Sequence, residues 1–334
     1  MKHSKVVGQG YYVPDSVVTN DDLSKIMDTS DAWIQERTGI QERRHLGRHS
    51  GQTTRDLGYK AAMKALGSAN LKPSDLDFIV FATLSPDYFF PGNGVLLQQD
   101  LGCDTIGALD VRNQCSGFIY ALSTADAFIK TGMYKTILVV GAEHHSVGLD
   151  MTTRGRGVSV IFGDGAGAVI LQANDQSKGI LSCNMGSQGE HAEELAVLFP
   201  GSKYGWADEY NDAHITPEII YPVMNGTFVF KHAVVRFAEA IDKVLLDAGK
   251  TMDDVSLLIP HQANLRISQF IQKKYGLSDD RVFNNIQKYG NTTAGSIPIA
   301  FAEAMEAGRI KEGDLVCMAA FGSGFTWGAV LIQF

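Results

Sequence analysis

The chain has 334 residues, 45% of them hydrophobic, and a formal net charge of −8. This length is ample for a large buried core, and an acidic surface argues against non-specific binding to nucleic acid or to an anionic membrane. No apolar window approaches the roughly 18 residues that span a bilayer, and we see no signal peptide. The four cysteines have no spacing typical of disulfide frameworks or zinc sites, so we expect a protein of the reducing cytoplasm without a bound metal.

Short, β-rich apolar runs alternate along the chain with helix-like segments. The runs read as strands buried on both faces, and the alternation favours a layered α/β fold. In chain order we expect a helix over Thr54–Ala69, a strand over Phe78–Phe81, a helix over Ser116–Thr131, strands over Ile137–Val140 and Ala168–Leu171, a helix over Phe230–Ala248, a strand over Leu257–Ile259, helices over Leu265–Tyr275 and Ile297–Ala307, and a strand over Leu315–Met318.

Three pairs of segments repeat in the same order at nearly the same separation: Asp75–Val80 with Asp254–Ile259, Asn113–Gly117 with Asn291–Gly295, and Thr136–Val139 with Asp314–Cys317. Ordered matches of this kind predict two homologous α/β halves. We place them at residues 1–175 and 176–334, joined by a turn over 175–179. Such a duplication brings Cys115 and Asn291 near a common pseudo-twofold axis.

Cys115 is the first candidate for chemistry. It follows an expected strand and opens an expected helix, so it lies among unpaired N–H groups at the positive end of the helix dipole. Both effects favour the nucleophilic thiolate, and the same N–H groups can hold an oxyanion. A cysteine with only a packing role in the core is the common alternative, which the position alone leaves open.

His261 and Asn291 are the second and third candidates. His261 comes directly after a buried strand, where ligands collect in open α/β sheets, and it suits hydrogen-bond donation to a carbonyl oxygen or proton transfer. Asn291 lies in a polar turn bounded by glycine and offers a second neutral donor, although a structural histidine and a turn asparagine are common alternatives. A cysteine, histidine and asparagine together suit acyl-thioester formation with decarboxylative condensation, or papain-like hydrolysis.

Seven ordered strings indicate a resemblance that covers essentially the whole chain: Asp28–Ile34, Arg37–Ile40, Cys115–Phe118, Phe162–Ala168, Pro260–Arg266, Gly290–Thr292 and Gly322–Gly328. The sequence resembles the 3-oxoacyl-acyl-carrier-protein synthase III family. The resemblance implies a thiolase-like fold, in which two duplicated α/β halves form an αβαβα arrangement.

The resemblance also implies a mechanism. Cys115 takes an acyl group from a coenzyme A thioester, and His261 and Asn291 stabilise the enolate that forms when a malonyl thioester loses carbon dioxide. The backbone N–H groups of Cys115 and Ser323 form the oxyanion hole. Acyl-CoA and malonyl-acyl carrier protein are the implied partners. Coenzyme A thioesters enter as substrates, and no separate cofactor is implied.

By the same resemblance two residue sets are expected to bind these partners. The coenzyme A channel contains Trp33, Arg37, Arg156, Gly226, Phe230, Asn264 and Arg266, with adenine between Trp33 and Arg156. A basic patch for the acidic carrier protein contains Lys231, Arg266, Lys273 and Lys274.

Two further regions bear on specificity. Phe90 is the candidate for the aromatic residue that crosses the interface of a homodimer and limits acyl length in relatives. The segment over 186–222 is longer than in typical members and matches no expected element, so it is a candidate cover for the pocket. The identity of the primer, the carrier of the extender and the pathway stay open.

Other functions use the same residues. An acyltransferase with an alcohol or amine acceptor, or a thioesterase, would share the acyl-cysteine. A catalytically silent partner of another condensing enzyme is a third hypothesis, disfavoured by the intact Cys115, His261 and Asn291. A papain-like protease is disfavoured because the cysteine lies in a duplicated α/β pattern.

Overall fold

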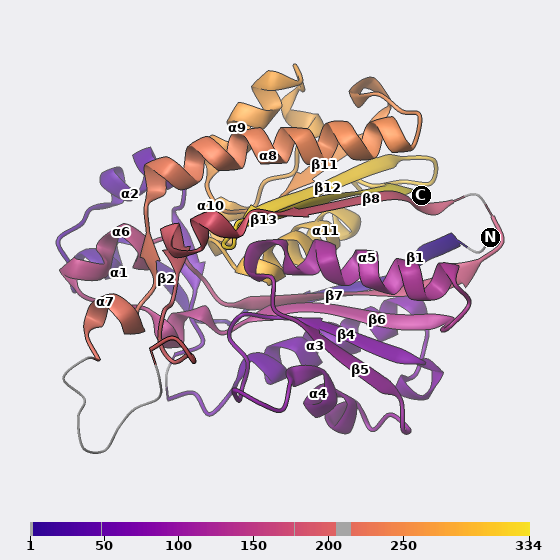
Figure 1. The fold of residues 1–334 in the computed structure, drawn as a ribbon, viewed down its shortest axis with the longest axis horizontal. Coiled ribbons are helices and arrows are strands. Elements are labelled where there is room, and N and C mark those ends of the chain that lie inside the picture. The colour runs from indigo at the N-terminus through magenta and orange to yellow at the C-terminus, as the bar shows by residue number, and fades with distance from the viewer. Residues whose placement is uncertain (1–2, 48, 177, 205–214) are drawn as a thin grey trace.

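Residues 3–47, 49–176, 178–204 and 215–334 are described by a computed structural model, and they form two stacked sheets among layers of helices (Figure 1). The first sheet has the order β1-β7-β6-β4-β5 and the second the order β11-β12-β13-β8. The strands of the first are β1 (His3–Tyr12), β4 (Phe78–Ala82), β5 (Gly107–Val111), β6 (Thr136–Glu143) and β7 (Gly165–Asn174). Those of the second are β8 (Gly179–Ser187), β11 (Leu257–Pro260), β12 (Leu315–Gly322) and β13 (Thr326–Gln333).

The helices form three layers. α3 (Thr54–Ala69) and α4 (Asn93–Leu101) cover the outer face of the first sheet, and α8 (Gly226–Asp247) and α9 (Leu265–Lys274) cover that of the second (Figure 1). α5 (Gly117–Lys130) and α11 (Ser296–Glu306) lie between the sheets, where one hydrophobic cluster joins residues of both sheets and both helices. The expected αβαβα arrangement is therefore confirmed.

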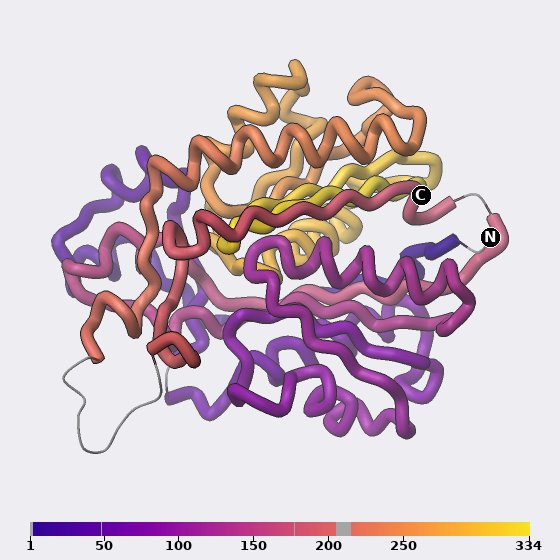
Figure 2. Tube along the Cα trace, in the orientation of Figure 1, coloured from indigo at the N-terminus to yellow at the C-terminus, as the bar shows by residue number. Residues whose placement is uncertain are grey.

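The two sheets share one connectivity. β6 pairs parallel with β4 and antiparallel with β7, which pairs antiparallel with β1. β12 likewise pairs parallel with β11 and antiparallel with β13, which pairs antiparallel with β8. The fifth strand of the first sheet, β5, pairs parallel with β4. The second sheet has a single parallel bridge at the corresponding edge, between Leu258 of β11 and Val282. In Figure 2 the purple to magenta strands of the first sheet lie in the lower part of the view, and the yellow strands of the second sheet lie above them.

Most expected elements occupy the expected places, because their burial and capping signals are local. β4 and β6 are buried along their whole length. α3 begins at a capping box between Thr53 and Asp56 and ends at Asn70, whose φ is 55°. α8 differs from the expectation, since Asn225 accepts a hydrogen bond from the N–H of Phe228 and starts the helix at Gly226 instead of Phe230.

Within the described residues, further small helices and two small sheets lie beside these layers. The helices are α1 (Asn20–Ser24), α2 (Asp31–Thr38), α6 (Arg156–Ser159) and α10 (Ile286–Tyr289), and the sheets pair β2 (Val17–Thr19) with β3 (Glu42–Arg44) and β9 (Leu195–Ala196) with β10 (Val223–Met224). Among the residues that the structure describes, no helix has the length and apolarity needed to cross a membrane.

The long segment over 186–222 is partly described. It contains the 3₁₀ helix η5 (Gly189–Glu194), β9 and α7 (Pro217–Ile220), and its start is tied to the loop after β12 by a pair of backbone hydrogen bonds between Gln188 and Phe325. The hydroxyl of Ser323 also donates to the carbonyl of Leu195. Residues 205–214 of this segment, among them Gly205, Trp206 and Asn211–His214, lie outside the described residues.

Candidate active site

Cys115 lies at the junction of the two sheets, in a 3₁₀ turn, η2 (Gln114–Ser116), between β5 and α5. The side chain is buried, with 7% of its surface exposed. The end of β12 approaches it so closely that a Cβ built on Gly322 would lie 2.5 Å from the Cβ of Cys115. Only glycine at this position lets the second half close over the cysteine.

Burial raises the pKa of the Cys115 thiol to about 12, and the nearby Glu143 carboxylate acts in the same direction. Hydrogen bonds from the backbone N–H groups of Cys115 and Ser323 lower the pKa, but they do not offset burial. The expectation that the helix N-terminus favours a thiolate is therefore wrong for the free enzyme, because the same packing that aims the N–H groups also excludes water. Those two N–H groups point at the sulfur and lie close enough to donate to the carbonyl oxygen of a thioester that the sulfur attacks.

Glu143 is a functional candidate that the sequence analysis missed. It ends β6 as a buried carboxyl, and burial raises its pKa to about 7. Its oxygens accept hydrogen bonds from Thr83, Leu84 and Ser85, the shortest being 2.6 Å from the Ser85 hydroxyl, and a longer one of 3.4 Å from the N–H of Ala294. Glu143 thus links the segment after β4 to the turn that carries Asn291. An acidic residue that closes an otherwise apolar strand is the signal that could have found it.

His261 follows β11 and is held by its backbone N–H, which donates to the carbonyl of Ala319 over 2.8 Å. Its ring is 2% exposed. Nδ1 lies 2.5 Å from the hydroxyl oxygen of Ser296, whereas Nε2 is buried without a partner among the described residues. Burial lowers the pKa of His261 to about 3, so the ring is neutral at physiological pH.

Asn291 is fixed by its backbone and by its own side chain. Its N–H donates to Ile161 over 2.8 Å, and its carbonyl accepts from Gly163 over 3.0 Å. Its side-chain oxygen accepts a 2.8 Å hydrogen bond from the N–H of Thr293, and no hydrogen bond of the described residues uses Nδ2. The amide therefore presents its NH₂ group as an available donor.

The turn after Asn291 meets the turn of Cys115. It is the 3₁₀ turn η9 (Thr293–Gly295), which leads into α11 and contacts η2. The carbonyl of Ala294 packs against Gly141, where an added Cβ would lie only 2.2 Å from it. The structure thereby brings the elements of Cys115, His261 and Asn291 to one place: His261 contacts the first residue of α11, and Asn291 lies two residues before η9.

The expected coenzyme A residues lie on α2, α6, α8 and α9. The guanidinium carbons of Arg37 and Arg156 lie 4.4 Å and 5.3 Å from the centre of the Trp33 ring. An adenine ring stacked between Trp33 and Arg156 would need the two side chains to be about 7 Å apart, the sum of two van der Waals contacts. Because the observed separation is smaller, Arg156 would have to move. Asn264 is the N-cap of α9 and donates to the carbonyl of Arg37 over 2.9 Å, which gives it a structural role at this position.

Gly226 and Phe230 lie in the first two turns of α8, and Phe230 makes an edge contact with Phe270 of α9. The four residues of the expected basic patch, Lys231, Arg266, Lys273 and Lys274, are all exposed. Lys274 lies 3.9 Å from Asp242, which partly neutralises it. Phe270, 46% exposed, lies among these charges on α9 and adds an apolar contact area that the sequence analysis did not include.

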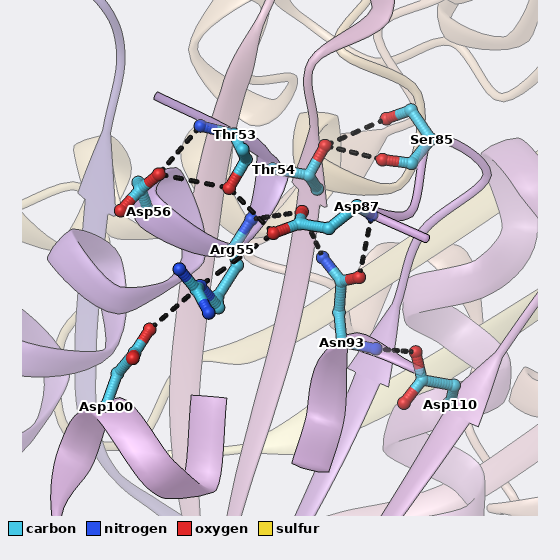
Figure 3. Close-up of polar contacts among 9 residues, drawn as sticks. All are labelled: Thr53, Thr54, Arg55, Asp56, Ser85, Asp87, Asn93, Asp100 and Asp110. Carbon is cyan, nitrogen blue, oxygen red and sulfur yellow. Dashed lines mark hydrogen bonds and ion pairs between the residues drawn. The ribbon is translucent and has the colours of Figure 1, made fainter. Parts of the chain in front are cut away.

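Phe90 is 81% exposed on a loop whose base is held by hydrogen bonds. Figure 3 shows the network that holds this base: the Asp87 carboxylate accepts from the Thr53 hydroxyl over 2.7 Å and from the Asn93 amide over 3.0 Å. The backbone N–H of Asn93 in turn donates to Asp110 over 2.6 Å. The loop therefore projects an aromatic side chain outward from a fixed support.

Two thiolase-like sheets with a buried cysteine at their junction and a neutral histidine at the end of a strand define a class of acyl-transferring enzymes. Two family models match, 3-oxoacyl-[acyl-carrier-protein] synthase III over residues 109–189 and its C-terminal part over residues 245–334. The β-ketoacyl-[acyl-carrier-protein] synthase III of Clostridium acetobutylicum is 42% identical over 333 residues, covering 100% of this chain and 99% of the relative.

Solved structures agree with the sequence matches. The 3-oxoacyl-[acyl-carrier-protein] synthase III of Aquifex aeolicus has a TM-score of 0.89 at 44% identity, covering 99% of this chain and 100% of that chain. A priming β-ketosynthase of a polyketide pathway has the same TM-score at 29% identity, covering 99% of this chain and 96% of that chain. The chain belongs to the 3-oxoacyl-acyl-carrier-protein synthase III family, and it is a condensing acyltransferase.

Proposed function

We propose that this enzyme condenses an acyl group from a coenzyme A thioester with a malonyl group carried on an acyl carrier protein. The Cys115 sulfur attacks the thioester carbonyl, the bond to the coenzyme A sulfur breaks, and the thiol proton leaves with coenzyme A. The developing oxyanion accepts hydrogen bonds from the N–H groups of Cys115 and Ser323, which already point at the sulfur.

In the second half the malonyl thioester loses carbon dioxide, and its electron pair forms an enolate. Nε2 of His261 and Nδ2 of Asn291 donate to the enolate oxygen. The enolate carbon then attacks the acyl-cysteine carbonyl, the C–S bond to Cys115 breaks, and a 3-oxoacyl thioester leaves. The single observation that carries this proposal is the buried Nε2 of His261, which has no partner among the described residues and therefore calls for a ligand atom.

The buried neutral donors favour condensation over the acyltransferase and thioesterase alternatives. Hydrolysis or transfer to an alcohol needs a base that accepts a proton from the nucleophile. A histidine whose pKa is about 3 is a poor base at neutral pH and a suitable neutral donor. Since the donors and the acyl-cysteine supply the chemistry, the proposal requires neither a metal nor a further cofactor.

The carrier protein is proposed to dock on α8 and α9, on the patch of Lys231, Arg266, Lys273 and Lys274 around Phe270. Exposed positive charges complement an acidic partner and speed encounter, and an exposed aromatic ring adds contact area. Trp33, Arg37 and Arg156 are proposed to hold the nucleotide end of coenzyme A once Arg156 moves.

The functional unit is proposed to be a homodimer in the cytoplasm, with Phe90 entering the partner's acyl pocket. Support comes from the projecting loop and from β5, an edge strand of the first sheet on which Leu109 is 38% exposed. The four cysteines are all free, which suits a reducing compartment. Sedimentation analysis of the purified protein tests the dimer.

Intact-mass spectrometry tests the reaction. The protein is mixed with a panel of acyl-CoAs and then chased with malonyl-acyl carrier protein. We expect an acyl adduct on Cys115 that disappears on the chase while a 3-oxoacyl group appears on the carrier. An adduct lost to water or to another nucleophile, with no product on the carrier, would overturn the proposal in favour of hydrolysis or transfer.

A further inference from the structure

The two ring nitrogens of His261 lie in different surroundings. Nδ1 is 2.5 Å from the hydroxyl oxygen of Ser296, while Nε2 is buried and has no partner among the described residues. A neutral imidazole has one proton, so one nitrogen donates and the other accepts. The position of that proton decides whether Nε2 can donate to an oxyanion or would repel it with a lone pair.

The hydroxyl of Ser296 has one hydrogen-bond partner within the described residues. This serine is the first residue of α11, it is 2% exposed, and within the described part of the chain its hydroxyl hydrogen-bonds only to His261. If Nδ1 carried the proton, the hydroxyl proton of Ser296 would be buried without an acceptor. If Ser296 donates to Nδ1 instead, its proton is used, and the ring proton sits on Nε2, where the substrate binds.

The chemistry of the partner also keeps the ring neutral. A carboxylate beside Nδ1 would favour an imidazolium and a proton-transfer role, whereas a hydroxyl brings no charge. The position at the N-terminus of α11, the positive end of the helix dipole, disfavours a second proton on the ring. These features suit a histidine that donates one hydrogen bond and keeps its proton.

We propose that Ser296 is a positioning residue, which holds His261 in the tautomer with its proton on Nε2. Asn291 is oriented in a parallel way, because the N–H of Thr293 engages its side-chain oxygen and leaves the NH₂ group to donate. Both enolate donors are thus set by a neighbouring residue of the segment that opens α11. This inference rests on the proposed function for its catalytic consequence, but the tautomer itself is measurable without turnover.

The tautomer is measured first, on the wild-type protein. Long-range proton–nitrogen correlation spectra of protein labelled with ¹⁵N-histidine distinguish a protonated from a bare ring nitrogen, and the His261→Ala variant assigns the signal among the nine histidines. We expect the proton of His261 on Nε2. A proton on Nδ1 overturns the proposal, and this result needs no active enzyme.

The catalytic consequence is measured on Ser296→Ala. We expect acylation of Cys115 by acyl-CoA within about twofold of wild type and a condensation kcat lower by about tenfold, less than the 10²–10³ lost when a whole oxyanion donor is removed. Ser296→Thr keeps the hydroxyl and should restore both the rate and the Nε2 proton. Ser182→Ala is the matched control. It also removes a buried serine hydroxyl, which donates to the carbonyl of Val244 over 2.7 Å and takes no part in the candidate site.

The outcomes distinguish the proposed role of Ser296 from the proposed condensation reaction. Condensation at the wild-type rate in a folded Ser296→Ala variant overturns the positioning role. Equal losses in acylation and condensation also overturn it, since they indicate general disruption. If the wild type forms no acyl-enzyme with any acyl-CoA yet shows the Nε2 proton, the proposed reaction fails while the role of Ser296 in setting the tautomer stands.

Discussion

Two turns meet at the candidate active site, one from each half of the chain. Their backbone conformations are similar, but their side chains differ in chemistry. Each begins with a non-glycine residue at positive φ, Gln114 at 44° and Thr293 at 50°, and each leads through a 3₁₀ turn into a helix between the sheets. Such conformations cost of order 1–3 kcal/mol and cluster at functional sites.

The difference lies in the side chains on this shared frame. The second residue is Cys115 in one turn and Ala294 in the other, and the Ala294 turn is instead flanked by Asn291 and Ser296. In the proposed reaction, the first half supplies the nucleophile and the second half supplies the neutral donors. The two turns have similar backbones and different side chains, so a shared geometry can present different chemical groups at one site.

The largest effect is expected when the side chain of Cys115 is removed from the first turn. Cys115→Ala should abolish the acyl-enzyme completely, because Ala294 shows that alanine fits this backbone without supplying a nucleophile. Intact-mass spectrometry with acyl-CoA measures the adduct, and a Cys183→Ala variant is the control. An adduct that persists on Cys115→Ala would remove the cysteine from the proposed role.

The second effect separates the halves. His261→Ala should lower condensation by about 10²–10³, the typical cost of losing one oxyanion donor, while acylation of Cys115 stays near the wild-type rate. Single-turnover acylation and the malonyl chase are measured on the same preparation. Equal losses in both steps would contradict the division of labour between the halves.

The third effect tests the contact between the halves. In Gly322→Ala the new Cβ would lie 2.5 Å from the Cβ of Cys115, and a shift of about 1 Å at the nucleophile costs up to about 10²-fold in rate. We expect slow acylation and a lower Tm. Gly67→Ala, on α3 with nothing within 4 Å of the added Cβ, is the control and should leave activity unchanged and stability equal or higher. Wild-type acylation in Gly322→Ala would show that the strand end can yield.

The fourth effect concerns the protonation of the first turn. The pKa of Cys115 is raised to about 12, so the thiolate fraction should grow about tenfold per pH unit from pH 6 to 9. Alkylation by iodoacetamide, followed by mass spectrometry and corrected with Cys115→Ala, should rise without a plateau. A plateau below pH 8 would mean that the helix terminus outweighs burial after all.

The smallest effect lies farthest from the turns. Charge reversal at Arg266 together with Lys273 should raise the apparent KM for malonyl-acyl carrier protein by several-fold, most strongly at low salt, because exposed charges act mainly on encounter. Lys135→Glu, at an exposed residue directly before β6, is the control variant. An unchanged KM would remove α9 as the docking helix.

Much of this protein follows from local sequence patterns. Buried strands such as β4 and β6 are recognisable in the sequence as apolar runs, and the start of α3 is marked by a capping box. Cys115, His261 and Asn291 stand at the ends of strands or in polar turns, where local rules point to chemistry. The repeated segments predict the two similar halves because related sequences adopt related elements.

Only the tertiary structure decided the protonation and the hydrogen-bond partners of the candidate catalytic side chains. Burial and Glu143 raise the pKa of Cys115 against the local effect of its turn, and Gly322, far away in the chain, closes over it. Ser296 is an ordinary helix-opening residue by sequence, and it becomes notable only because the fold sets it 2.5 Å from Nδ1 of His261. Desolvation and hydrogen-bond partners depend on what packs from distant parts of the chain, and no local pattern records that packing.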